Sequence, residues 1–72
     1  MPTTRQYLRT LDKAKLREIF GKARLTPEEN NLVTYAFIGK YRVAKSCELL
    51  NISKTKYHSM LNEALIKIEF QL

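Results

Sequence analysis

Between positions 54 and 62 the chain carries a group of side chains that can form hydrogen bonds with a nucleic acid. Lysine can reach phosphates or guanine edges, and threonine and serine can bond several base edges. A threonine methyl group can also contact thymine, and asparagine can bond adenine if its helix lies deep enough in the groove. The side chains concerned are Lys54, Thr55, Lys56, His58, Ser59 and Asn62.

The same sequence offers few residues for catalysis or for metal binding. His58 is the lone histidine and Cys47 the only cysteine, so a nucleophilic pair, a multi-cysteine metal site and an internal disulfide are not expected. Paired catalytic groups and a glycine-rich phosphate loop are also missing. We therefore expect no enzyme, no metal and no cofactor. His58 is interpreted as a surface residue that touches phosphate, and Cys47 as a small buried hydrophobe rather than a redox switch.

The overall charge indicates an anionic partner. Thirteen Lys and Arg face seven Asp and Glu, which gives a formal net charge of +6. Positive charge on so small a body attracts polyanions, and we favour nucleic acid over an anionic membrane surface. The sequence holds no apolar run long enough for a membrane span and no secretory leader, so we expect a cytoplasmic protein with no membrane partner. Charge alone leaves RNA or ribosome binding open.

Length and composition predict one all-α domain over residues 1–72. The chain is 44% hydrophobic, too much for a disordered tail. A chain this short has a thin core, which very regular helix packing or dimerisation would support. Apolar residues at three- and four-residue steps predict a compact four-helix domain that contains a helix-turn-helix.

The amino-terminal segment, residues 1–22, is expected to form one helix over about 4–20. Gly21 would supply the left-handed residue that ends it. Four cations recur every four residues on one face of this helix: Arg5, Arg9, Lys13 and Arg17. Such a stripe is usually a solvated face. Like charges at this spacing destabilise an isolated helix slightly, which favours an anionic partner: a longer DNA footprint or an acidic protein.

A supporting helix is predicted over 26–39. Its start signal is strong, because Thr26 can cap the helix, Pro27 suits the first helical position and Glu29 can complete a capping box. Gly39 is expected to end it.

The remaining segment, 42–70, has the order of a helix-turn-helix. A short helix over 43–50 is followed by Asn51, which tolerates a left-handed turn conformation, and by a longer helix that Ser53 caps. The apolar positions 43, 47, 50, 52, 57 and 61 would lock the two helices at a steep angle. In this motif the second helix lies in the DNA major groove.

Two stretches of the chain resemble the promoter-reading carboxy-terminal domain (region 4) of bacterial sigma factors. They are LTPEE at 25–29 and AKSCELLNISKTKYHSMLNEALIKI at 44–68. The family has a Leu-Thr/Ser-Pro-x-Glu start, an E-x-A-x-x-L-G-I-S turn and a closing A-L-x-K-L. The matching positions are Leu25, Thr26, Pro27 and Glu29 at the start, Leu50, Ile52 and Ser53 in the turn, and Ala64, Leu65, Lys67 and Ile68 at the close.

The resemblance implies base or phosphate contacts from the start of the last helix, and backbone contacts from Arg42 and Lys45. Three positions depart from the family pattern: Asn51 replaces glycine, Cys47 replaces alanine, and the bulkier Tyr57 replaces a small aliphatic residue. The complete set of predicted DNA-binding residues is Arg42, Lys45, Ser53, Lys54, Thr55, Lys56, His58, Ser59 and Asn62.

These features together predict a sequence-specific regulator of transcription that binds duplex DNA, as a homodimer on paired half-sites. No upstream sigma domain accompanies the motif in this chain, so the expected type is a small stand-alone regulator from a phage or mobile element. The alternative is a protein-interaction module that uses the same fold to bind RNA polymerase or another host protein.

Overall fold

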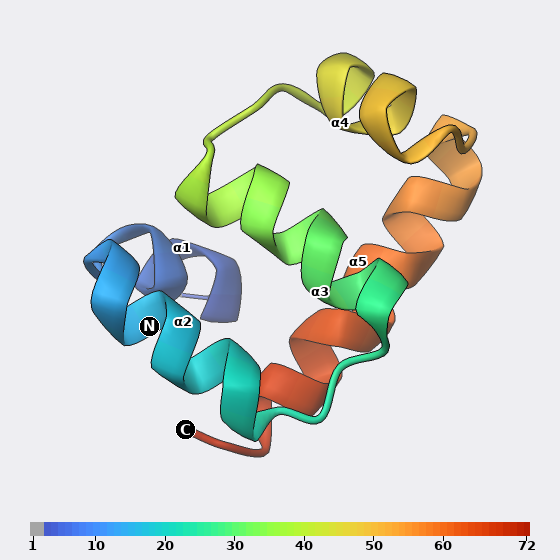
Figure 1. Cartoon of the computed structure of the whole chain (residues 1–72). Coiled ribbons are helices and arrows are strands. Elements are labelled where there is room, and N and C mark those ends of the chain that lie inside the picture. Colours follow the sequence, from blue (N-terminus) through green and yellow to red (C-terminus); the bar gives the residue numbers. More distant parts are fainter. Residues whose placement is uncertain (1–2) are drawn as a thin grey trace.

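The computed structural model describes residues 3–72, and all regular structure in that range is helical. Helix α5 contacts each of the other four α-helices and runs along the molecule from α4 to the end of α2 (Figure 1). The all-α class is confirmed, but the described residues form five α-helices instead of four. In chain order the elements are α1 (Thr4–Arg9), α2 (Lys13–Lys22), α3 (Pro27–Val33), the π-helical segment η1 (Thr34–Ile38), α4 (Val43–Leu50) and α5 (Lys54–Glu69). Positions 1 and 2 of the predicted amino-terminal segment lie outside the described residues.

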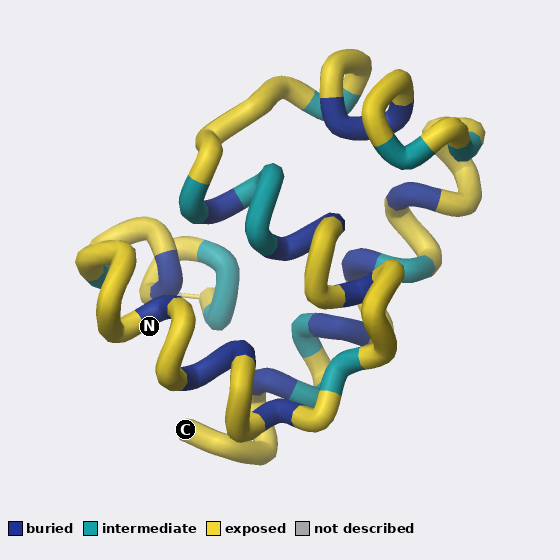
Figure 2. The backbone as a smooth tube through the Cα atoms, in the orientation of Figure 1, coloured by how far each residue is buried: buried dark blue, intermediate teal, exposed yellow. Residues whose placement is uncertain are grey.

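The core lies where the inner faces of these helices meet, and the buried stretches of the backbone face the middle of the molecule (Figure 2). Phe20 and Phe37 join α2 to η1, with ring centroids 6.3 Å apart. Tyr35 is half-buried and packs its ring beside Tyr41. The buried hydrophobic residues are Leu8, Leu16, Ile19, Phe20, Ala23, Leu32, Val33, Phe37, Cys47, Tyr57, Leu61, Ala64 and Ile68.

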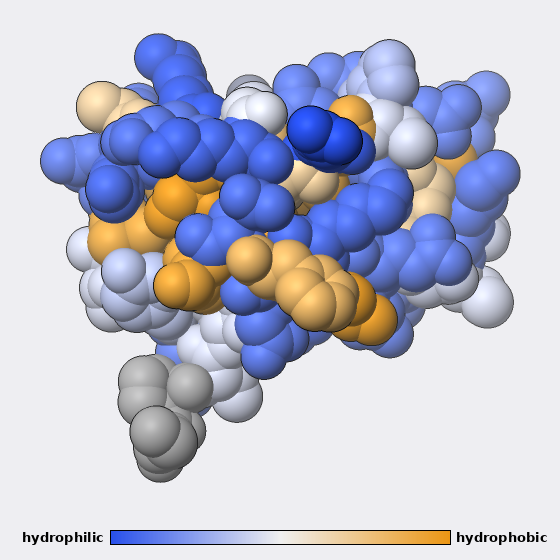
Figure 3. All heavy atoms as spheres, turned by 90° about the horizontal axis from the view of Figure 1, so that it is seen from below, coloured by the Kyte–Doolittle hydropathy of each residue, from blue (hydrophilic) through white to orange (hydrophobic). Residues whose placement is uncertain are grey.

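Large apolar side chains stay exposed where α5 ends. Ile66 is 56% exposed, Phe70 84% and Leu72 55%. Seen from below, hydrophobic surface lies in the middle of this end of the molecule and hydrophilic surface encloses it (Figure 3). The carboxy-terminal residues therefore do not close the core, and we call Ile66, Phe70 and Leu72 the carboxy-terminal apolar patch.

The expectation of one helix over 4–20 is wrong, because the helix is interrupted between α1 and α2. Asp12 caps α2 by accepting a hydrogen bond from the Lys15 backbone N–H at 2.8 Å. The Thr10 hydroxyl donates to the Tyr7 carbonyl at 2.7 Å as α1 ends. Short polar side chains favour such caps over helix interiors, since they bond the backbone locally. The four-cation stripe is thereby divided: Arg5 and Arg9 lie on α1, and Lys13 and Arg17 on α2.

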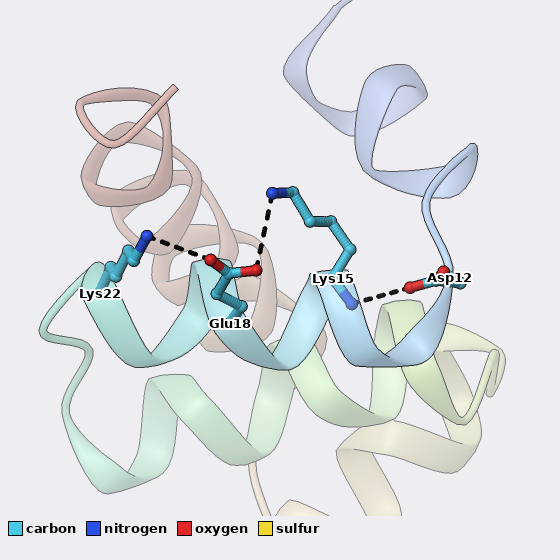
Figure 4. A network of polar contacts seen from close by, with 4 residues as sticks. All are labelled: Asp12, Lys15, Glu18 and Lys22. Atoms are coloured by element: carbon cyan, nitrogen blue, oxygen red, sulfur yellow. Dashed lines mark hydrogen bonds and ion pairs between the residues drawn. The ribbon is translucent and has the colours of Figure 1, made fainter.

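Two exposed ion pairs lie on the outer face of α2 (Figure 4). Glu18 lies 3.2 Å from the Lys22 ammonium and 3.6 Å from that of Lys15. The hydrogen bond from Lys22, together with the charges of both lysines, holds the pKa of Glu18 below its ordinary value. Pairs so open to solvent contribute little to stability.

The two glycines do not act as expected. Gly21 lies inside α2, and the left-handed residue after that helix is Arg24, with φ 54°. Gly39 has a right-handed φ of −75°, and the left-handed residue is Lys40. A Cβ atom on Gly39 would lie 3.2 Å from the Tyr41 ring and 3.3 Å from the Tyr35 carbonyl oxygen. A larger residue at position 39 would therefore require the Tyr41 ring or the Tyr35 carbonyl to shift by a few tenths of an ångström.

The capping box predicted for α3 is confirmed, and it contains a buried charge. Thr26 Oγ1 accepts from the Glu29 N–H at 3.1 Å, while Glu29 Oε1 accepts from the Thr26 N–H at 3.0 Å. The same Glu29 oxygen lies 2.6 Å from Lys67 Nζ on α5. Burial by itself raises the pKa of Glu29, but the bonds from Lys67 and Thr26 outweigh it and leave that pKa below its ordinary value. One carboxylate thus caps α3 and ties it to α5.

Replacing Asp12 by alanine should destabilise the domain by about 1 kcal/mol, because α2 loses its amino-terminal cap. For a domain of this size that is a fall in melting temperature of about 4–8 °C, measured by circular dichroism. Asp12→Asn is the matched control, since asparagine caps equally well. An equal loss in both variants would contradict the capping role.

Replacing Glu29 by glutamine should lower the free energy of unfolding at neutral pH by about 1–2 kcal/mol, between the values typical of exposed and buried pairs. Because the folded-state pKa of Glu29 is depressed, its contribution is complete above the unfolded value of about 4.3 and is lost as pH falls through the folded pKa. Wild type and E29Q should therefore converge in acid, as followed by urea denaturation. Glu18→Gln, which breaks only exposed pairs, should behave like wild type; a difference between wild type and E29Q that does not change with pH would refute the ion-pair account.

Candidate nucleic-acid interface

Helices α4 and α5 are joined by the three residues 51–53. Asn51 takes the left-handed conformation expected of it, with φ 57° and ψ 48°. This bend lets the Ile52 N–H donate to the Cys47 carbonyl at 3.1 Å. Ser53 then caps α5, as predicted, by accepting from the Lys56 N–H at 3.2 Å. The cap uses Ser53 Oγ as an acceptor, so its hydroxyl proton remains able to donate.

Buried side chains hold the two helices together. Ser46 is wholly buried, Cys47 is buried as predicted, and Tyr57 is buried beside them. The Ser46 hydroxyl makes no hydrogen bond of standard geometry. Burial raises the pKa of the Tyr57 phenol, and the nearby Ser46 hydroxyl opposes that rise. These buried side chains hold the start of α5 firmly against α4.

The outward face of α5 follows from helix geometry. At 3.6 residues per turn, Thr55 and Ser59 lie one turn apart on the side opposite the buried Tyr57 and Leu61. Both are exposed. Lys54 and Lys56 project about 160° apart, to the two flanks of this face. The predicted contact residues therefore form a central line of hydroxyls with a cation on either side.

The flank that carries Lys56 faces α3. Lys56 borders an open hollow of about 390 Å³ together with Glu28 and Asn31. The acidic neighbour makes this the less cationic side of α5.

The other flank faces α1 and carries His58 and Asn62. The His58 ring lies edge-on to Tyr57 with centroids 5.4 Å apart, and it borders a hollow that Arg42 also lines. Asn62 borders a separate hollow with Thr4 and Arg5 of α1. Asn62 is thus displaced from the central line toward α1.

The two residues predicted on α4 occupy different surroundings. Arg42 is the N-cap residue of α4, but its side chain makes no capping bond and stays exposed. Lys45 is exposed on the first turn of α4 and lines none of the hollows described above. The structure therefore brings Arg42 and His58 together and leaves Lys45 apart.

Two further cations lie at this surface, which the sequence offered only as half of a stripe that could lengthen a DNA footprint or bind an acidic protein. Arg5 and Arg9 border the same hollow as Arg42 and His58, although some thirty residues or more separate them in the chain. Their four-residue spacing was a visible signal. It pointed to a continuous stripe with Lys13 and Arg17, whereas the break at Asp12 leaves Arg5 and Arg9 on α1, and only these two of the four border this hollow.

Two other kinds of site do not occur within residues 3–72. In that range no three His, Cys, Asp or Glu side chains come close enough together to hold a metal ion. None of the helices described is both long and apolar enough to cross a membrane.

Comparison of the chain with protein families, with curated proteins and with solved structures finds no match. The resemblance to the sigma-factor domain therefore rests on the residues of 25–29 and 44–68, and it stays a prediction.

Proposed function

We propose that the protein regulates transcription by binding duplex DNA, with the first two turns of α5 in the major groove. The observation that carries this proposal is the exposed start of α5, where hydroxyl and cationic side chains project from a buried support and the first turn holds no acidic residue. An α-helix with its side chains is about 10–12 Å wide and fits the major groove, which is about 12 Å wide.

The arrangement around α5 suggests separate roles for its side chains. Thr55 and Ser59 on the central line would face base edges, where hydroxyls can donate or accept. Lys54 and Lys56 on the two flanks would approach phosphates of opposite strands. Phosphate contacts position a protein on DNA and base contacts specify the sequence, so the lysines supply affinity and the hydroxyls discrimination.

The contact surface has a natural end along α5. Glu63 and Ile66 follow Ser59 on the outward face, and both are exposed. A carboxylate repels phosphate, and an isoleucine offers no hydrogen bond. The groove-facing part therefore stops near Asn62, which suits a helix that enters the groove by its amino-terminal end.

The two flanking lysines give the sharpest test. After selection of bound sites from a random duplex library, the double variant Lys54→Ala/Lys56→Ala should lose the gel shift, because two phosphate contacts are removed. The slope of log affinity against log salt should fall by about 0.9 per phosphate that is no longer neutralised. Lys15→Ala/Lys22→Ala carries the same charge change on α2 and should bind almost normally.

Unchanged binding by the α5 double variant would overturn the proposed interface. No enrichment of any duplex, or preference for structured RNA at equal salt, would reject the proposed function itself. Enriched inverted repeats and a dimeric mass in sedimentation are expected for a homodimer on paired half-sites.

The carboxy-terminal apolar patch favours a second function, the binding of RNA polymerase or another transcription protein. Phe70 is almost fully exposed, and large apolar side chains grouped in this way mark protein-interaction surfaces. On this hypothesis, Phe70→Ser should abolish stoichiometric co-purification with purified polymerase, while Lys54→Ala/Lys56→Ala should leave it intact. Recovery of polymerase by neither wild type nor variant would exclude this partner.

A further inference from the structure

A cationic hollow lies where α1, the start of α4 and the second turn of α5 meet. It encloses about 200 Å³ and is bordered by Arg5 and Arg9 of α1, Arg42 before α4, and His58 of α5. Tyr57 and Leu61, both buried, also line it. We call this the α1–α5 cleft. Three segments distant in sequence each supply it with at least one nitrogen donor.

No carboxylate lines the α1–α5 cleft, nor the adjoining hollow of about 300 Å³, which Arg9, Lys40 and Tyr41 border. The ion pairs among residues 3–72 involve Lys15, Lys22 and Lys67, none of which borders the cleft. Arg5 also borders a hollow with Glu69, but these two side chains form no ion pair. Among residues 3–72, therefore, no carboxylate forms an ion pair with the cationic side chains that border the α1–α5 cleft.

The charge of Arg5 also reaches the buried side of the cleft. Burial raises the pKa of the Tyr57 phenol, and the positive charge of Arg5 opposes that rise. An ionised phenol is an anion, so the charge of Arg5 favours it, but burial outweighs this effect and the pKa of Tyr57 is raised overall.

We infer that the α1–α5 cleft is a phosphate-binding site and that α1 belongs to the nucleic-acid interface. Guanidinium groups bind phosphate through paired, charge-assisted hydrogen bonds, and two or three converging forks can surround one phosphate group. The chemistry recognised is a phosphate monoanion or dianion. Its assignment to the backbone of bound duplex rests on the proposed function.

The position of the cleft selects one DNA strand. His58 lies one turn after Lys54 on the flank of α5 that faces α1. A backbone that follows this flank passes from Lys54 over His58 toward Arg42 and the arginines of α1. The opposite flank has an acidic neighbour, Glu28, and no comparable cluster of arginines. We therefore expect α1 to hold the strand on the His58 side.

The first experiment titrates the protein alone with inorganic phosphate and follows its amide resonances by NMR. The amides of Tyr41, Arg42 and His58 should shift with saturation in wild type. They should stop shifting in Arg5→Gln/Arg9→Gln, while Arg5→Lys/Arg9→Lys should restore a weaker response. Circular dichroism checks that each variant folds. Absence of saturable shifts at these amides in wild type would overturn the site.

The second experiment measures duplex affinity against salt for the same variants. Arg5→Gln/Arg9→Gln should weaken binding to all sequences and lower the salt slope by about 0.9 for each phosphate that these arginines neutralise in wild type. Lys13→Gln/Arg17→Gln, which removes the other two cations of the sequence stripe, is the charge-matched control and should change the slope little. Equal effects of both pairs would show a general charge effect and overturn the backbone assignment.

The two results separate this inference from the proposed function. If wild type binds no duplex, the proposed function fails, and the phosphate titration alone decides whether the α1–α5 cleft binds anions. If duplex binds and the slope is unchanged in Arg5→Gln/Arg9→Gln, the proposed function stands, and the role of α1 in it is rejected.

Discussion

The buried carboxylate of Glu29 is the contact on which the arrangement of the domain depends. It closes the first turn of α3 with Thr26 and also binds Lys67 on α5, thirty-eight residues away in the chain. A buried charge is costly unless it is paired and hydrogen-bonded, and Glu29 obtains both from the capping box and from Lys67. The pair fixes the carboxy-terminal half of α5 beside the start of α3. The amino-terminal half is then held by α4.

Helix α5 consequently serves two purposes that compete for its surface. Its inner face, with Tyr57, Leu61, Ala64 and Ile68, completes a core that a chain of 72 residues can barely supply. Its outer face is left free along the first two turns, because no other helix covers Thr55 or Ser59. Few side chains can be spared from packing in so small a domain. The exposed side chains of these two turns are hydroxyls and cations, and the buried Tyr57 and Leu61 lie on the opposite side of the helix.

Local signals in the sequence were enough to predict the caps of α3 and α5 and the turn between α4 and α5, but they missed the break before α2 and the approach of α1 to α5. Thr26, Asn51 and Ser53 behave as expected, because each acts within a few residues of itself. The break at Asp12 was missed because the apolar spacing of Leu8, Leu11 and Leu16 also suits a continuous helix, and the capping bond of one aspartate decided between the alternatives. The glycines were misplaced because Arg24 and Lys40 adopt the left-handed conformation instead. No local pattern could show that α1 returns to α5.

The approach of α1 to α5 brings Arg5 and Arg9 close to Arg42 and His58, and grouping these cations costs free energy. Arginines brought together without a paired carboxylate repel one another, although Arg9 and Arg42 are exposed and solvent screens much of that repulsion. Helix α2 shows that the chain can neutralise its cations, since Glu18 forms ion pairs with both Lys15 and Lys22. A domain with a thin core has little stability with which to offset an unpaired cluster. If the α1–α5 cleft binds phosphate, the duplex backbone would supply the anion that pairs with its cations, beside the groove that α5 would enter.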